Sequence, residues 1–132
     1  MTMSVYDIAG RAMSAQLVRL NTTASNLANA GTLAGSKEGA FRALKPVFQA
    51  VGERPGVATV KVNSVVASTT EPTRRHDPTN PLADKNGDVW ESGVDGAAEM
   101  VEMIETARQY QNNVQVLQTA KTLTLDTLRL GK

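Results

Sequence analysis

The chain has 132 residues, of which 41% are hydrophobic and 4% aromatic, so the sequence predicts one small domain whose core is built from Val, Leu, Ala and Met. Its formal net charge of +1 gives no electrostatic basis for binding nucleic acid or an anionic membrane. The absence of cysteine excludes a disulfide framework and a cysteine-based metal site.

Membrane and secretion signals are missing from the sequence. No stretch approaches the roughly 20 consecutive apolar residues that a membrane-spanning helix needs. Residues 1–17 lack the basic segment and following apolar segment of a secretory signal peptide. We therefore expect no direct membrane insertion, and if the protein leaves the cytoplasm, we expect a route without a cleaved signal.

Residues 1–31 are predicted to form a helix. Gly31 after Asn29 favours a helix end there, because both residue types tolerate the left-handed conformation. Only three charged residues occur in the segment, fewer than a solvated helix normally carries, so this helix is expected to lie against other protein. Its apolar residues follow the alternating four- and three-residue spacing of a heptad seam: Met13, Leu17, Leu20, Ala24 and Leu27.

The last part of this helix, "NTTASNLANAGT" (residues 21–32), is rich in small polar residues. Such residues compete with the helical backbone for hydrogen bonds and usually lie at caps and turns. One interpretation is a frayed helix end with capping residues. The interpretation we favour is that Asn26 and Asn29 lie at a subunit interface, where short side chains allow close approach and hydrogen-bond neighbouring backbones.

Residues 32–94 are more polar than the two predicted helices, because they hold 15 of the 27 charged residues of the chain. We therefore expect this segment to face water. Short strands are predicted at 41–51 and 56–69, around the turn "GERPG". Pro46 makes the first of them an edge strand or an irregular one. Residues 71–88 contain three prolines and clustered Asp, Asn and Thr, and they are predicted to form an extended, turn-rich loop.

Residues 95–132 are predicted to hold a second, longer helix that begins at Asp95, a favourable N-cap. Its apolar stripe also keeps heptad spacing: Met100, Met103, Ala107, Tyr110, Val114 and Leu117. The stripe breaks at Lys121. Beyond it, apolar residues lie on more than one side of the helix: Leu123, Leu125, Leu128 and Leu130. A helix that is apolar on several sides is expected to be buried on several sides.

The predicted fold is mainly α with a β-rich middle. Two long terminal helices (1–31 and 95–132) pair as a coiled-coil-like hairpin, and a small irregular β segment and an extended loop (32–94) lie between them. One copy of the chain has no further surface to cover the apolar end of the last helix. Neighbouring subunits are therefore expected to cover it, and the chain ends are expected to become ordered on assembly.

Three stretches of the chain resemble flagellar axial proteins. "LNTTASNLANAGT" is similar to the N-terminal signature of flagellar rod and hook proteins, a run ending in S/N-N-L-A-N followed by Thr, on which residues 25–29 and Thr32 fall. "HDPTNPLADKNGDV" and the terminal run that begins "AAEMVEMIETARQY" resemble proximal rod subunits of the FlgC type. The length suits that small subunit, although Asp88 and Gly93 depart from its pattern.

This resemblance implies a structural subunit of the bacterial flagellar basal body, without a cofactor. It implies polymerisation through the terminal helices into a rod that crosses the periplasm, transmits torque and encloses the export channel. The implied partners are copies of the chain, other flagellar rod proteins and the type III export apparatus, with no nucleic acid. The residues predicted to lie at subunit interfaces are Leu17, Leu20, Asn26, Leu27, Asn29, Met100, Met103, Tyr110, Val114, Leu117, Leu123, Leu125 and Leu128.

Catalytic and metal sites are not predicted, so we do not expect an enzyme. His76 is the only histidine, and a possible calcium loop at 84–95 has Val89 where such loops need Gly. Two alternatives stay open: another flagellar axial subunit of the hook or distal-rod type, and a soluble coiled-coil adaptor. The residues also leave open the fold of 33–70 and the role of residues 74–76.

Overall fold

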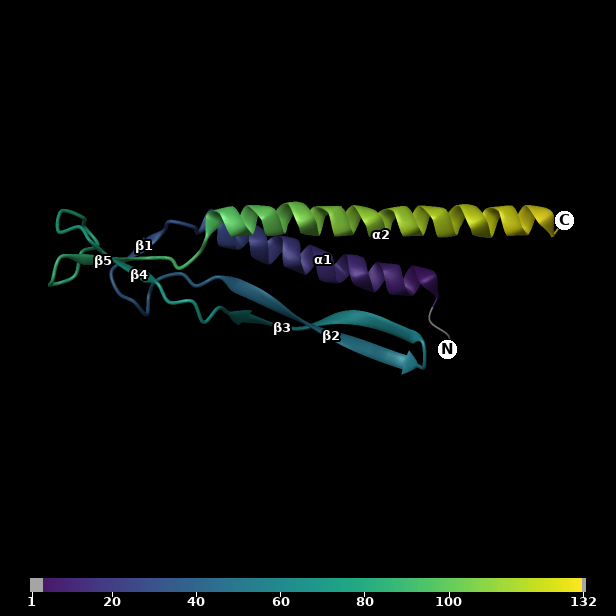
Figure 1. Ribbon diagram of the computed structural model, residues 1–132, viewed down its shortest axis with the longest axis horizontal. Helices are drawn as coiled ribbons and strands as arrows, with labels where there is room; N and C mark the ends of the chain where they lie inside the picture. The colour runs from purple at the N-terminus through teal and green to yellow at the C-terminus, as the bar shows by residue number, and fades with distance from the viewer. Residues whose placement is uncertain (1–3, 132) are drawn as a thin grey trace.

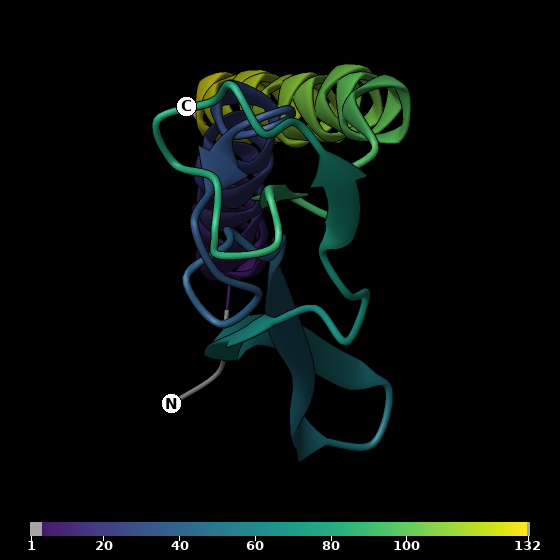
Figure 2. The same ribbon diagram turned by 90° about the vertical axis from the view of Figure 1, so that its left-hand side faces the viewer.

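The computed structural model describes residues 4–131, so residues 1–3 and 132 of the predicted terminal helices lie outside the described residues. Helix α1 is the middle of three layers, with helix α2 on one side of it and a β-hairpin on the other (Figures 1 and 2). The layers are α2 (Gly96–Leu130), α1 (Val5–Ala28) and the hairpin of β2 (Leu44–Arg54) and β3 (Val57–Ala67). The prediction of two helices with a small antiparallel β region between them is confirmed.

Helix α1 begins and ends at residues that cap it. The Ser4 hydroxyl accepts a hydrogen bond from the Asp7 N–H (3.2 Å), and the Asp7 carboxylate accepts one from the Ser4 N–H (2.9 Å). At the other end Asn29 is the C-cap, and its side-chain amide donates to the Ser25 carbonyl (2.8 Å). Gly31 then turns the chain with a φ of 81°. The predicted helix end at residues 29–31 is confirmed.

Helix α2 begins at its predicted N-cap, since the Asp95 carboxylate accepts hydrogen bonds from the N–H groups of Ala97 and Ala98 at 3.0 and 3.2 Å. It has 35 residues and α1 has 24, so at 1.5 Å per residue it is longer by about 16 Å. The C-terminal end of α2 therefore projects past the beginning of α1 (Figure 1). Neither helix in the described part of the chain combines the length and apolar character that crossing a membrane requires.

The strands β2 and β3 form an antiparallel ribbon that contacts α1 along both strands. The chain reverses within the predicted turn "GERPG", where Gly56 has a φ of 81°. Pro46 lies within β2, which tolerates it because each strand of a two-stranded sheet is an edge. Most of the segment 33–70 is thus an extended hairpin rather than a compact β unit. Since such a ribbon is marginal by itself, it depends on its contact with α1.

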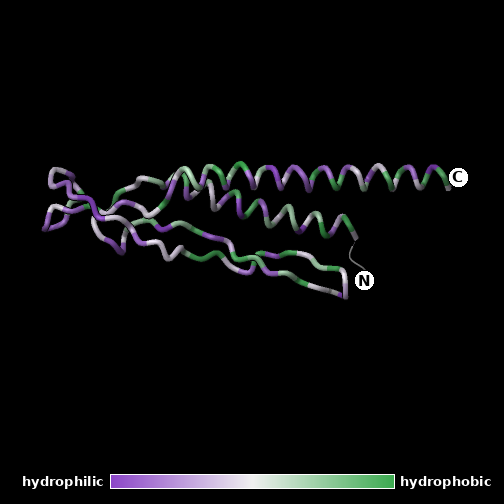
Figure 3. The backbone as a smooth tube through the Cα atoms, viewed as in Figure 1, coloured by the Kyte–Doolittle hydropathy of each residue, from purple (hydrophilic) through white to green (hydrophobic). Residues whose placement is uncertain are grey.

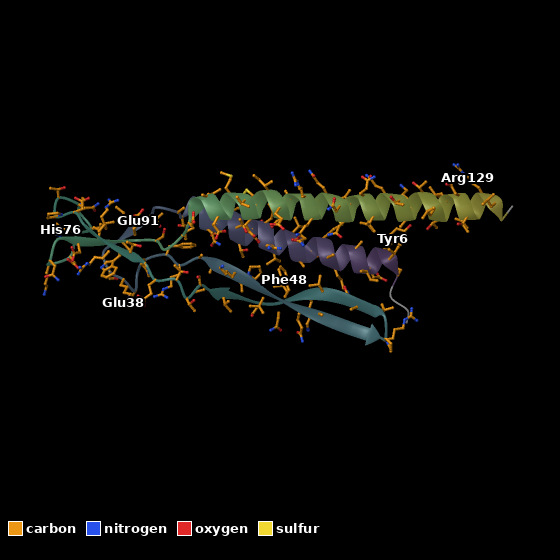
Figure 4. All side chains as sticks on the ribbon, in the orientation of Figure 1. Tyr6, Glu38, Phe48, His76, Glu91 and Arg129 are labelled. Carbon is orange, nitrogen blue, oxygen red and sulfur yellow. The ribbon has the colours of Figure 1, made fainter. Side chains whose placement is uncertain are left out.

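A second sheet lies at the end of the molecule opposite the two termini (Figure 1). Its antiparallel strands are ordered β1 (Leu33–Ala34), β5 (Asp88–Glu91) and β4 (Thr73–His76). The predicted loop over 71–88 is therefore wrong for residues 73–76, which pair with β5. Hydrophilic residues dominate this end (Figure 3), and His76 lies at its outer tip (Figure 4). There the His76 Nδ1 lies 2.9 Å from Asp88 Oδ1, with 67% of the His76 side chain exposed.

The turn before β5 is held by one carboxylate. Asp84 Oδ1 accepts hydrogen bonds from the N–H groups of Asn86 (2.8 Å) and Asp88 (3.0 Å), and Gly87 has a φ of 79°. The hydrogen bond from the Asp88 N–H is the largest cause that lowers the pKa of the Asp84 carboxyl, partly opposed by desolvation. No group of three or more His, Cys, Asp or Glu side chains in the described residues is arranged to hold a metal ion.

The Asp84 turn is expected to weaken in acid. Because the carboxyl has a lower pKa in the folded chain than its ordinary 3.8, its contribution is fully present above that value and is lost as the pH falls through the folded pKa. An NMR titration should give an Asp84 midpoint below 3.8. Asp84→Ala should speed hydrogen exchange at the Asp88 amide, whereas Asp84→Asn, which keeps an acceptor oxygen, should retain most of the protection. An unshifted midpoint would contradict these hydrogen bonds.

Candidate assembly surface

The two helices run antiparallel, and hydrogen-bonded polar side chains link them at several points along their length. The Gln16 amide donates a hydrogen bond to Gln109 Oε1 at 2.8 Å. Near the beginning of α1, the Tyr6 hydroxyl reaches toward α2 and lies 3.3 Å from the Thr124 hydroxyl (Figure 4). These paired groups set which residues of one helix lie opposite which residues of the other.

An ion pair adds to this contact further along the helices. The Arg19 guanidinium binds the Glu102 carboxylate, and the two side chains are 27% and 35% exposed. Thr106, one turn beyond Glu102, is fully buried, and its hydroxyl donates to the Glu102 carbonyl oxygen at 2.7 Å. Because water screens a partly exposed pair, we expect the pair to add little stability and mainly to favour one alignment of the helices.

Asn26 joins the three layers. Its side-chain Nδ2 donates to the Leu44 carbonyl (2.9 Å) and to Glu99 Oε2 (3.2 Å), while its Oδ1 accepts from the Leu44 N–H (2.7 Å). The residue is 2% exposed. The amide therefore pairs with both backbone groups of the first residue of β2, as a neighbouring strand would, and also binds α2.

On α1, the predicted interface residues lie in three different environments. Asn26 is buried within the chain, Leu17 is 47% exposed, and Leu20, Leu27 and Asn29 are half-buried. The Asn29 side chain caps its own helix, and the Asn26 amide donates two hydrogen bonds and accepts one within the same chain. A role for these residues between copies of the chain stays a prediction.

On α2, the predicted interface residues divide by position along the helix. Met103, Tyr110, Val114 and Leu117 are half-buried. Met100, Leu123, Leu125 and Leu128 are exposed. The exposed group includes the whole projecting end, since every residue from 121 to 130 is exposed.

Apart from Asn26, which was predicted to lie between subunits, sequence reasoning missed the polar residues that link the helices, because it followed apolar residues. A second stripe with the same three- and four-residue spacing was present among the polar residues and would have identified them. It consists of Gln16, Arg19, Thr23 and Asn26 on α1 and of Glu99, Glu102, Thr106 and Gln109 on α2.

The polar contact leaves large apolar side chains on the outside of the helices, and apolar residues recur along α2 to its end (Figure 3). Scattered exposed apolar residues are normal, but a series along one helix marks an interaction surface. Besides Tyr6, whose hydroxyl lies against α2, the exposed members on the helices are Val5, Leu17, Met100, Val101, Ile104, Val116, Leu123, Leu125, Leu128 and Leu130.

Known proteins match the chain at both helices and over its length. A family model described as "Flagella basal body rod protein" matches residues 7–32, and one described as "Flagellar basal body rod FlgEFG protein C-terminal" matches residues 85–130. The chain is 46% identical to the flagellar basal-body rod proteins FlgC of Salmonella typhimurium and Escherichia coli O157:H7, and 44% identical to that of Yersinia enterocolitica. Each comparison covers 98% of both chains.

The position of Asn26 predicts a loss of stability when its amide is removed. Asn26→Ala leaves the Leu44 N–H and carbonyl without their partner, so the free energy of unfolding should fall by about 2 kcal/mol. Equilibrium urea unfolding of the full chain measures this change. The matched control is Asn21→Ala on the same helix, where the side chain is exposed and the change should stay within roughly 0.5 kcal/mol. Equal midpoints for the two variants would contradict the role given to Asn26.

Proposed function

The chain belongs to the family of flagellar basal-body rod proteins FlgC, and we propose that it assembles through the outward apolar sides of its two helices. Membership of this family makes the chain a structural subunit of the basal-body rod and implies assembly with other rod components. The family is one of structural proteins and not of enzymes. A hook or distal-rod subunit and a soluble adaptor are not favoured, since the relatives compared above over nearly the whole chain are FlgC proteins.

The observation that carries the proposal is the division of side chains between the two sides of the helices. Polar residues with heptad spacing make the contact inside one subunit, which supports a coiled-coil-like hairpin of α1 and α2. Many of the large apolar side chains of the two helices stay exposed, and burial against another protein chain would cover them. In this proposal residues 1–31 and 95–132 form the axial core of the rod, and residues 32–94 lie outside it.

The proposed assembly gives the chain its role in the flagellum, as a subunit of the rod. Copies polymerise with each other and with neighbouring rod proteins into a shaft that crosses the periplasm, transmits torque and encloses the export channel. The subunit reaches this place through the flagellar export apparatus without a cleaved signal. The absence of cysteine is compatible with passage into an oxidising compartment, because no thiol can mispair there.

The energy for assembly is proposed to come mainly from apolar burial. Covering a fully exposed leucine side chain contributes about 1.5–3 kcal/mol. Leu123, Leu125 and Leu128 are 62%, 46% and 62% exposed, so each retains a sizeable part of that contribution for a neighbouring subunit. Several such side chains are needed, since association must also offset the lost freedom of the subunits.

Charges on the projecting end of α2 should therefore block assembly. Leu125→Glu with Leu128→Glu removes about 3 kcal/mol of potential burial, which should raise the concentration needed for assembly by roughly a hundredfold. Analytical ultracentrifugation of the purified full chain over a concentration series measures the effect, and far-UV circular dichroism checks the helices. Leu82→Glu with Asn86→Glu adds the same charge at exposed positions of the opposite end and should assemble normally. Normal assembly of the α2 variant would refute this surface.

A further inference from the structure

We propose that Asn86 is a site of spontaneous deamidation, and that the turn held by Asp84 slows this reaction in the folded chain. Among the asparagines of the sequence, only Asn86 is followed by glycine. Glycine has no side chain to hinder its own backbone nitrogen, so in an Asn-Gly pair that nitrogen reaches the asparagine side chain most readily. This chemistry is independent of how copies of the chain assemble.

The reaction needs only the chain and water. The backbone nitrogen of Gly87 loses its proton and bonds to Cγ of Asn86, while the Cγ–Nδ2 bond breaks and the amide nitrogen leaves with the proton as ammonia. Water then opens the resulting cyclic imide. Opening at Cγ gives aspartate, and opening at the main-chain carbonyl carbon gives isoaspartate, whose backbone runs through the former side chain. Either product replaces a neutral amide with a carboxylate.

The folded turn exposes Asn86 but restrains the nitrogen that would attack it. The Asn86 side chain is exposed, so water reaches it. The Gly87 N–H, however, donates a hydrogen bond to the Asp84 carbonyl oxygen at 3.0 Å. Attack requires this bond to break, because the nitrogen must lose that hydrogen and turn toward the side chain. Deamidation in the folded chain therefore waits for the turn to open locally.

Asp84 is the residue that keeps the turn closed. Its carboxylate accepts hydrogen bonds from the N–H groups of Asn86 at 2.8 Å and Asp88 at 3.0 Å. Its backbone N–H donates to the Asp88 carbonyl oxygen at 2.9 Å, and its own carbonyl oxygen accepts from Gly87. Removing the carboxylate leaves only the two backbone hydrogen bonds, so the turn should open more often and the reaction should become faster.

The product should not fit the turn that the asparagine occupies. A Cβ added at Gly87 would lie 3.0 Å from the Pro78 Cβ and 3.1 Å from the His76 Cε1, so Gly87 already packs tightly. Isoaspartate inserts one more carbon into the backbone directly before Gly87. The new carboxylate also stands between Asp84 and Asp88 in the sequence and repels both. We therefore expect modification to open the turn and to loosen the start of β5.

Peptide mapping by mass spectrometry measures conversion at Asn86 in the purified full chain, kept at mildly alkaline pH to favour loss of the backbone proton. Asp84→Ala should convert roughly fivefold faster than the unmodified chain, since each lost hydrogen bond favours the closed turn by about a factor of two to ten. Asp77→Ala is the matched control, because that carboxylate bonds to Thr79 and Asn80 instead, and its rate should be unchanged. Circular dichroism checks that each variant keeps its helices.

Unfolding the full chain in urea separates the sequence from the fold. Without the turn, the unmodified chain and Asp84→Ala should convert at the same rate, faster than either does when folded. Gly87→Ala in urea should convert much more slowly, since its methyl group hinders the attacking nitrogen. The packing around Gly87 does not affect this comparison, because every chain is unfolded.

The modified chain itself tests the effect on the turn. Conversion lowers the formal net charge of +1 by one unit, so ion exchange separates the product from the unmodified chain. Hydrogen exchange at the Asp88 amide should be faster in the product, and an unchanged rate would show that the turn tolerates the modification.

Two results would overturn the proposal. If Asn86 does not convert even in urea, it is not a deamidation site. If the folded unmodified chain converts as fast as folded Asp84→Ala or as fast as the unfolded chain, the turn gives no protection. Neither result bears on assembly of the subunit.

Discussion

The amide of Asn26 is the interaction on which the layered arrangement depends. It lies where α1, β2 and α2 converge, and it serves both backbone groups of Leu44 and the carboxylate of Glu99 at once. Aspartate and glutamine, the side chains most similar to asparagine, fit the position less well. Aspartate would lack the donor and would oppose the Glu99 charge, and glutamine would add a methylene group to a residue that is already 2% exposed. The marginal β-ribbon is thus attached to the helices through a residue within the helical signature "NLAN".

The use of polar groups between the helices has a physical cost and a benefit. Hydrogen bonds and partly exposed ion pairs add little net stability, since the same groups bond water in the unfolded chain. These polar contacts do fix the alignment of α1 against α2, however, because a shift of one residue would separate Gln16 from Gln109 and Arg19 from Glu102. The outward leucines have the opposite character, since apolar burial is strong and non-directional. In the proposed assembly, the polar side of each helix selects the register within one chain, and the exposed apolar side supplies the larger share of the energy for binding between subunits.

The parts of the fold that depend on near neighbours could be predicted from the sequence. The Asp95 cap, the helix end at Asn29 and Gly31, and the turn "GERPG" all involve groups within a few residues of one another. The N-terminal cap of α1 is also local, since Ser4 and Asp7 have the three-residue spacing of a capping box. Sequence reasoning overlooked this cap.

Other features depend on distant partners and could not be predicted in this way. Strand β4 is exposed along its whole length, so it shows no alternation, and its hydrogen-bonding partner β5 follows only after a turn-rich segment. The helix contact escaped prediction because Arg19 meets a residue 83 positions away and because pattern reading gives weight to apolar side chains. On α2 beyond residue 121 the apolar residues lie exposed in the single chain, and their role at a subunit interface stays a prediction.

The pairing of the first helix with the last has a consequence for when the molecule can fold. Asn26 and Glu99 are separated by 73 positions, so closing the loop between them costs about 4 kcal/mol of chain entropy before any contact is made. During synthesis, α1 leaves the ribosome long before α2 exists, and the hairpin that follows it is marginal without further support. The complete three-layer arrangement therefore cannot form until translation is almost complete, because α2 is the last element to be made.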